Sequence, residues 1–174
     1  GEYDISSLQA VRGGGAAMPK AVAQRLRELT GLEYVEGYGM SETMAATHIN
    51  PPHRPKPQCL GIPVFDVDAR VVDPATFAEL PPGEIGEIVV HGPQVMLGYW
   101  NNPQATADAF DANGYMRTGD VGYMDADGYI HIVDRTKDML LCSGYNVYPR
   151  TIEEAIYAHP AVAEVCVIGI PDEY

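Results

Sequence analysis

The chain has 174 residues, a length that fits one domain or two small ones, and its 46% hydrophobic and 20% charged residues are typical of a globular protein. Acidic residues outnumber basic ones by 24 to 11, and the resulting net charge of −13 predicts no nucleic-acid partner, because an acidic chain repels phosphate backbones. The first residues lack a secretory leader pattern, and no stretch approaches the roughly 20 apolar residues needed to cross a bilayer, so neither a leader nor a transmembrane helix is predicted.

Residues 1–60 alternate strand and helix patterns. A short apolar strand leads into a run of glycines, and Pro19 then opens a helix in which Val22 and Leu26 recur at helical spacing. Gly31 is a suitable residue to end this helix. The predicted elements are a strand over residues 8–12, a helix from Pro19 to Gly31 and a strand over residues 34–39. Their order predicts a β-loop-α-β unit.

Residues 61–134 are predicted to be all-β, because short β-branched or aromatic runs alternate with Gly, Pro, Asn and Asp. Asp125 to Gly128 predicts a hairpin turn and not a calcium loop, since the glycine and the terminal glutamate of an EF-hand are misplaced. A short helix is predicted within residues 102–110, after Pro103. The predicted strands cover residues 64–72, 85–91, 114–124 and 129–133.

Residues 135–174 return to mixed structure, and residues 134–137 are the predicted boundary. Pro149 is expected to open a helix that ends near His159. The predicted strands cover residues 138–142 and 164–170, and a turn is predicted over residues 143–145. The last of these strands would present an unpaired apolar edge, which predicts self-association into a homodimer.

The three cysteines, Cys59, Cys142 and Cys166, are odd in number and widely spaced, which argues against a disulfide framework. Cys142 and Cys166 stand in apolar runs, so both are predicted to be reduced, buried thiols. A chain with reduced thiols is expected in the cytoplasm.

Two clusters of residues that could bind a ligand follow predicted strands in residues 1–60. Small residues over 13–17 would let a flat ring or a phosphate approach the backbone, although an isolated glycine run is more often only a tight turn. Tyr38 could stack on a base and Glu42 could hold Mg²⁺. The alternative is a partly buried tyrosine and a surface glutamate.

Two further clusters lie later in the chain. Thr118-Gly119-Asp120 presents one carboxylate that can accept two hydroxyl hydrogen bonds, as a ribose requires, although an aspartate in a hairpin is the simpler interpretation. Residues 134–138 and 143–149 place charges at the predicted domain junction. Positive charge gathers here at Arg117, Arg135, Lys137 and Arg150, although any one of these could be an ordinary surface charge.

In this order and at this spacing, the clusters belong to a longer series of matching motifs. The motifs are Gly-Gly-Gly-Ala-Ala-Met-Pro (13–19), Gly-Tyr-Gly-Met-Ser-Glu-Thr (37–43), Gly-Glu-Ile-Gly-Glu-Ile-Val-Val (83–90), Gly-Tyr-Trp-Asn-Asn-Pro (98–103), Tyr-Met-Arg-Thr-Gly-Asp (115–120), Asp-Arg-Thr-Lys-Asp (134–138), Ser-Gly-Tyr-Asn-Val-Tyr-Pro (143–149) and Gly-Ile-Pro-Asp-Glu-Tyr (169–174). The chain closely resembles the adenylate-forming superfamily, which includes AMP-forming acyl-CoA synthetases, luciferases and the adenylation domains of peptide synthetases.

The resemblance implies a mixed α/β fold in three parts. Residues 1–60 would be the end of the αβαβα large domain, residues 61–134 a β-barrel subdomain, and residues 135–174 the truncated start of a small α+β C-terminal domain. The family's phosphate loop would precede this chain and its catalytic lysine would follow it. The chain is therefore expected to be a fragment of a longer enzyme and to be inactive by itself.

The resemblance also implies which residues act. Those expected to bind the nucleotide or coenzyme A are Gly14, Gly15, Ala16, Tyr38, Gly39, Asp120, Arg135 and Gly144. Those expected to serve catalysis are Ser41 near the phosphates, Glu42 as the Mg²⁺ carboxylate and Lys137 as the hinge of the small domain. Within the first group, Tyr38 would stack on adenine, Asp120 and Arg135 would contact the ribose, and Gly144 would let the pantetheine arm pass.

The implied enzyme joins a carboxylic acid, fatty or related, to ATP and then passes the acyl group from AMP to coenzyme A. Its expected cofactors are ATP or AMP, Mg²⁺ and coenzyme A. One alternative is an aminoacyl adenylation domain of a peptide synthetase, which Met40 disfavours because those domains usually carry proline after Tyr-Gly. The other alternative is a non-catalytic binding module, and the flanking sequence would discriminate among the three.

Overall fold

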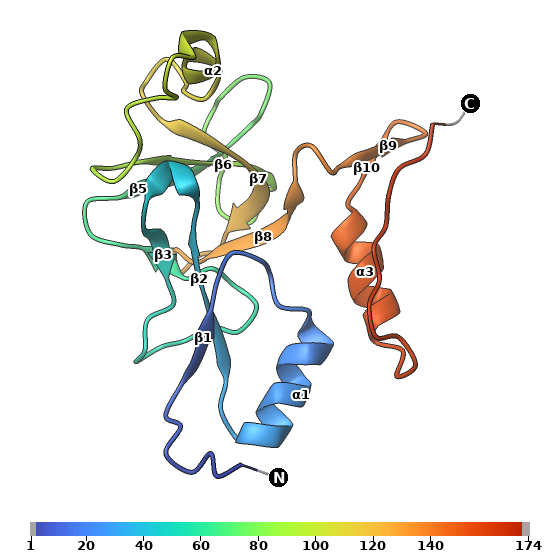
Figure 1. The fold of residues 1–174 in the computed structure, drawn as a ribbon. Coiled ribbons are helices and arrows are strands. Elements are labelled where there is room, and N and C mark those ends of the chain that lie inside the picture. The colour runs from blue at the N-terminus through green and yellow to red at the C-terminus, as the bar shows by residue number, and fades with distance from the viewer. Residues whose placement is uncertain (1–2, 172–174) are drawn as a thin grey trace.

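The computed structural model describes residues 3–171. Two sheets form the body of the molecule, and a hairpin and helix extend from it at the C-terminal side (Figure 1). Among the helices of this described range, none has the length and apolar character needed to span a membrane.

The first sheet has the strand order β1-β2-β3-β4. The strands β1 (Val11–Gly13) and β2 (Tyr34–Gly39) are parallel and are joined through the helix α1 (Lys20–Thr30), which confirms the predicted β-loop-α-β unit. The strands β3 (Ala46–Ile49) and β4 (Ile62–Pro63) continue the sheet in antiparallel pairs and were not predicted.

Local signals account for where α1 begins and ends. Pro19 precedes its first residue, Lys20, and fixes the backbone angle that the first turn needs. Gly31 follows the helix in the left-handed region at φ 72°, and its N–H donates to the carbonyl of Arg27 at 2.7 Å.

The second sheet is antiparallel, with the order β5-β6-β7-β8. Its strands are β5 (Asp68–Val72), β6 (Gly86–His91), β7 (Met116–Met124) and β8 (Ile130–Arg135). The helix α2 (Pro103–Asp108) lies between β6 and β7, and Asn102 Oδ1 caps it by accepting from Ala105 N at 3.1 Å. The predicted hairpin turn is also confirmed, because Gly128 N donates to Asp125 O at 3.0 Å.

The predicted β-barrel subdomain needs correction, because within residues 3–171 the second sheet stays open and β5 does not pair with β8. The edge of β8 that does not face β7 pairs with another segment of the chain. Ile130 donates to Gly61 O at 3.0 Å and accepts from Leu60 N at 2.9 Å, so the edge joins the segment that leads into β4. At Ile130 the edge of β8 thus pairs with residues 60–61, and not with β5.

A shared core joins the two sheets. The strand β6 is its centre, since Ile88 and Val90 are fully buried. Other members come from the neighbouring strands of the second sheet, whereas Tyr38 comes from β2 of the first sheet and Leu60 from the segment before β4. This packing holds the end of β2 beside β7 and β8, which is the arrangement on which the site depends.

The C-terminal part contains the hairpin β9 (Leu140–Cys142) and β10 (Tyr145–Val147), followed by the helix α3 (Pro149–Tyr157). The helix opens at Pro149 as predicted. The turn between the strands consists of Ser143 and Gly144, both in the left-handed region, at φ 51° and 83°.

Two predictions for the C-terminal part are wrong. The segment over residues 164–170 is not a strand; Val167 N donates to the side chain of Glu153 at 2.8 Å, and the backbone pairs with no other strand of the described chain. The strand edge assumed for the homodimer is therefore not formed. Cys142 and Cys166 are exposed, because these short apolar runs lie outside the core, whereas Cys59 is buried and its thiol pKa is raised by burial.

A buried histidine beneath Tyr38 predicts a pH-dependent stability. His48 on β3 is fully buried, its Nε2 atom has no hydrogen-bond partner within residues 3–171, and burial lowers its pKa from 6.5 to about 4. The unfolded chain takes up a proton near pH 6.5 and the folded chain only near pH 4. The contribution of His48 to the free energy of unfolding is therefore fully present above pH 7. It is lost as the pH drops from 6.5 towards 4, which lowers the free energy of unfolding by about 3 kcal/mol.

Urea unfolding of the chain at a series of pH values, followed by circular dichroism, measures this effect. In the variant His48→Gln, the free energy of unfolding should no longer show this decrease between pH 6.5 and 4. The control His53→Gln removes an exposed histidine and should keep the decrease. A decrease that is identical in all three proteins would contradict the prediction.

Candidate functional site

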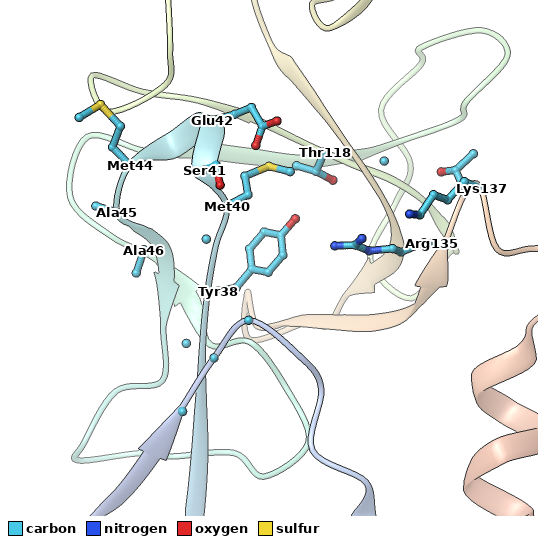
Figure 2. Close-up of a pocket in the computed structure, with 17 residues that line it drawn as sticks. Tyr38, Met40, Ser41, Glu42, Met44, Ala45, Ala46, Thr118, Arg135 and Lys137 are labelled. Carbon is cyan, nitrogen blue, oxygen red and sulfur yellow. The ribbon is translucent and has the colours of Figure 1, made fainter. Parts of the chain in front are cut away.

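A cavity of about 1120 Å³ opens where β2 ends beside the second sheet. Its walls come from four segments that are distant in the sequence, namely residues 13–15, residues 37–46 except Thr43, residues 118–119 and residues 135–137. Figure 2 shows the side chains of Tyr38, Glu42, Thr118, Arg135 and Lys137 around this space. A second cavity of about 500 Å³ shares part of these walls and continues to α3.

The structure brings together all but one of the site residues that the sequence analysis selected. The first cavity is lined by Gly14, Gly15, Tyr38, Gly39, Ser41, Glu42, Arg135 and Lys137. Ala16 and Asp120 line the second cavity. Gly144 lies in the β9–β10 turn and lines neither cavity.

The centre of the site is a hydrogen-bonded group made by Tyr38, Asp120 and Arg135. Asp120 and Arg135 are directly opposite in the β7–β8 pair, and Arg135 Nε donates to Asp120 Oδ1 at 3.1 Å. The hydroxyl of Tyr38 donates to the other carboxylate oxygen. In Figure 2 the Tyr38 hydroxyl and the Arg135 guanidinium point towards each other.

This arrangement sets the charge states and the remaining hydrogen-bonding capacity of the group. Burial, followed by the negative charge of Asp120, raises the pKa of Tyr38 well above its ordinary value, so the hydroxyl stays a neutral donor. The Asp120 side chain is 4% exposed, yet each oxygen accepts only one hydrogen bond from residues 3–171 and keeps a second acceptor position. The carboxylate can therefore accept two further hydroxyl hydrogen bonds.

The position of Asp120 is fixed by the residues just before it. Thr118 Oγ1 donates to Ile88 O at 2.7 Å and accepts from Asp120 N at 3.1 Å. The buried carboxylate of Glu87 accepts from Gly119 N at 3.3 Å, and it pairs with Arg117 at 2.8 Å. Arg117 is thus committed to Glu87 and does not line the cavities, in contrast to the other cations of the predicted cluster.

The remaining cations of that cluster do line the site. Arg135 and Lys137 line the first cavity, and the Lys137 ammonium points into it in Figure 2. Arg150 lines the second cavity and donates through its backbone N–H to Asp134 at 3.1 Å. This strongly acidic chain therefore places positive charge where an anionic ligand would need it.

The glycine loop lies against β2 with little room to spare. A Cβ atom on Gly14 would lie 2.7 Å from the carbonyl oxygen of Gly37, so a larger residue would push the loop away. Beneath the loop, the buried carboxylate of Glu36 accepts from Met18 N at 2.7 Å, and burial raises its pKa. Glu36 was not predicted as a site residue, although a lone acid inside an apolar strand was an available signal.

The Glu42 carboxylate extends from the one-turn helix η1 (Ser41–Thr43) towards the cavity (Figure 2). Its Oε1 atom accepts from the hydroxyl of Tyr99 at 2.8 Å. Tyr99 belongs to one of the matching motifs but was not predicted as a site residue, because only the folded chain brings it next to Glu42.

Comparisons with known proteins identify the family of this chain. Residues 1–100 match the family model of AMP-binding enzymes, and residues 151–174 match the model of the AMP-binding enzyme C-terminal domain. The chain belongs to the AMP-binding enzyme family, which confirms the resemblance seen in the motifs.

Relatives of known function share this segment. The chain is 46% identical to a long-chain-fatty-acid–CoA ligase of Bacillus subtilis, over 99% of this chain and 31% of that protein. It is 45% identical to one from Escherichia coli, over 98% and 30%, and 43% identical to a feruloyl-CoA synthase of Amycolatopsis, over 97% and 34%. The chain thus spans about a third of the length of these relatives.

Solved structures show the same fold. ATP-bound MatB from Rhodopseudomonas palustris superposes with a TM-score of 0.89 at 41% identity, over 94% of this chain and 33% of that one. The anthranilate CoA ligase AuaEII in complex with anthranoyl-AMP gives a TM-score of 0.88 at 33% identity, over 98% and 33%. The mixed α/β fold class is confirmed.

Proposed function

We propose that the protein containing this chain is an ATP-dependent acyl-CoA synthetase that acts on a fatty or related carboxylic acid. The observation that carries the proposal is the group of Tyr38, Asp120 and Arg135 at the edge of both cavities. The family membership and the ligase names of the relatives support it. The three parts, 1–60, 61–134 and 135–174, remain the proposed domain boundaries, and a cytoplasmic location remains part of the proposal.

The nucleotide would be held by groups that the fold has already fixed. The Tyr38 ring offers a flat surface for adenine, and the small residues Gly14, Gly15 and Ala16 let the base approach the backbone. Asp120 has two free acceptor positions for the two ribose hydroxyls, and Arg135 is at hand as a further donor. Preformed groups of this kind keep the entropy cost of binding low.

The phosphates would lie towards Ser41, Glu42 and Lys137. A single carboxylate beside bound phosphates is a common way to hold Mg²⁺, and Glu42 fits it because its Oε2 atom accepts no hydrogen bond from the described residues. When bound, the ion would neutralise phosphate charge. The Lys137 ammonium would add positive charge on the other side of the cavity.

Two transfers make up the proposed reaction. A carboxylate oxygen of the acid bonds to the α-phosphorus of ATP while the bond to pyrophosphate breaks, giving acyl-AMP. The sulfur of coenzyme A, having lost its proton, then bonds to the acyl carbon while the bond to AMP breaks. The chain's own residues contribute by positioning the nucleotide through Asp120 and by neutralising phosphate charge through Arg135 and Lys137.

Pyrophosphate exchange in the full-length protein tests the function. We expect ATP–pyrophosphate exchange that depends on a carboxylic acid from a panel of fatty and aromatic acids, followed by thioester formation with coenzyme A. Exchange that depends on an amino acid and gives no coenzyme A thioester would favour the peptide-synthetase alternative. No exchange with any acid would favour a non-catalytic binding module.

The proposed role of Gly144 gives a specific prediction. Gly144→Leu in the full-length protein should leave acyl-AMP formation largely intact and slow thioester formation at least about tenfold, because a side chain in this turn would block the pantetheine arm. Separate assays of the two half-reactions measure the split. Lys137 would be the hinge that brings this turn to the site.

Gly128→Leu is a matched control. Both glycines have φ 83° in a hairpin turn, and an added Cβ would have no atom of the described residues within 4 Å at either position, so the backbone strain is the same. The control should affect neither half-reaction. An equal loss in both half-reactions for Gly144→Leu would count against the pantetheine role.

A further inference from the structure

The hydrogen-bond partner of Glu42 comes from a segment 57 residues further along the chain. Tyr99 Oη donates to Glu42 Oε1 at 2.8 Å, and the backbone N–H of Met96 donates to the carbonyl oxygen of Glu42 at 2.7 Å. The segment 96–99 therefore holds both the side chain and the backbone of Glu42. The local sequence around Glu42 predicts neither of these two contacts.

Tyr99 is itself anchored. Its backbone N–H donates to Thr106 Oγ1 at 2.9 Å, and its carbonyl accepts from Asn102 N at 3.2 Å, so the start of α2 supports it. Gly98 has φ 151°, and a Cβ atom there would lie 2.6 Å from the Thr106 side chain, so this close approach needs a glycine. The hydroxyl is consequently presented to Glu42 from a fixed backbone.

The chemistry of this partner suits a carboxylate that must remain able to bind a cation. Tyr99 donates to Glu42 through a hydroxyl, which carries no charge. A neutral donor restricts the rotation of the carboxylate without cancelling its charge, whereas a lysine or arginine would compete with a metal ion for it. The Oε2 atom accepts no hydrogen bond within residues 3–171 and stays available at the cavity.

We propose that Tyr99 is a positioning residue that orients the Glu42 carboxylate for the divalent cation carried by the nucleotide. The inference rests on the proposed function, and it adds a residue that acts through Glu42. The simpler explanation is that the Tyr99–Glu42 bond only ties the loop 96–99 to η1. The two explanations differ in what they change, because a tie affects stability whereas a positioning contact affects metal affinity.

Binding of Mn²⁺ to the full-length protein in the presence of a non-hydrolysable ATP analogue tests the inference, with free Mn²⁺ measured by electron paramagnetic resonance. Tyr99→Phe removes only the hydroxyl and should weaken Mn²⁺ binding about tenfold. The melting temperature and the affinity for the analogue without metal should stay at the values of the unaltered protein.

Tyr115→Phe is the matched control. The Tyr115 hydroxyl also donates to a carboxylate, that of Asp68, at an exposed position that lines neither cavity. This variant should leave Mn²⁺ affinity unchanged. The same measurement on Glu42→Gln shows whether Glu42 holds the metal.

The outcomes separate the inference from the proposed function. Loss of Mn²⁺ affinity in both Glu42→Gln and Tyr99→Phe, with the control unchanged, supports the inference. Loss in Glu42→Gln but not in Tyr99→Phe overturns the inference and leaves the proposed function standing. No loss in Glu42→Gln overturns the inference together with the metal role of Glu42. If Tyr99→Phe lowered the melting temperature and weakened binding of the analogue without metal, the Tyr99–Glu42 bond would be a structural contact only, and the inference would be overturned.

Discussion

Replacing Asp120 with asparagine in the full-length protein is expected to weaken AMP binding by at least about 100-fold. Two ribose hydroxyls would each lose a charge-assisted acceptor, and each such bond contributes about 1.5–3 kcal/mol. The amide would also leave the buried hydroxyl of Tyr38 and the Nε atom of Arg135 competing for one oxygen. Isothermal titration calorimetry with AMP measures the affinity directly.

The surface of the same sheet offers a matched control for this substitution. Asp68 likewise accepts from a tyrosine, Tyr115, and from an arginine, Arg70, but it is exposed and lines neither cavity. Asp68→Asn should therefore leave AMP affinity unchanged. If Asp120→Asn folded normally by circular dichroism and bound AMP as well as the unaltered protein, Asp120 would have a structural role only.

Replacing Gly39 with alanine is expected to lower the free energy of unfolding by about 1–3 kcal/mol, the usual cost of forcing an extra carbon into a packed site. An added Cβ would lie 2.5 Å from the carbonyl oxygen of Ala45 and 2.9 Å from Cα of Ala46. Both are backbone atoms, so residues 45–46 at the start of β3 would have to move away from β2. The same movement would disturb Tyr38 and η1 on either side, and AMP affinity should fall as well.

Gly37→Ala is the control, because it changes the same strand at a position with room. Its Cβ would lie 3.5 Å from the His48 carbonyl, an ordinary van der Waals distance. Alanine there also reduces the conformational freedom of the unfolded chain, so stability should change little. Urea unfolding of both variants gives the comparison, and equal stability for both would show that β3 adjusts without cost.

Local sequence signals predicted much of the secondary structure, because the atoms that fix it are close in the chain. Pro19 and Gly31 bound α1, Asn102 caps α2, and the turn from Asp125 closes on its own backbone. The motif containing Asp120 was also selected from sequence, although its hydrogen bonds were not. Signals of this kind need no knowledge of the rest of the fold.

Other features depended on which segments meet. The strand β3 was missed because its buried residues Thr47 and His48 are polar, and only neighbouring strands explain their burial. The prediction of a closed barrel was wrong because β8 pairs at Ile130 with Gly61, and a contact between segments so distant in the chain leaves no local signal. Cys142 was placed in the core from its apolar neighbours, yet it is exposed in the β9–β10 hairpin.

The sequence by itself determined the family, the β-loop-α-β unit and which residue types would meet a nucleotide. Only the tertiary structure decided that Asp120 lies opposite Arg135, that Arg117 is committed to Glu87, and that Tyr99 reaches Glu42. The physical reason is that caps and turns are short-range interactions within a few residues. The register between strands and the packing of loops are set by the burial of distant apolar side chains, which no local pattern contains.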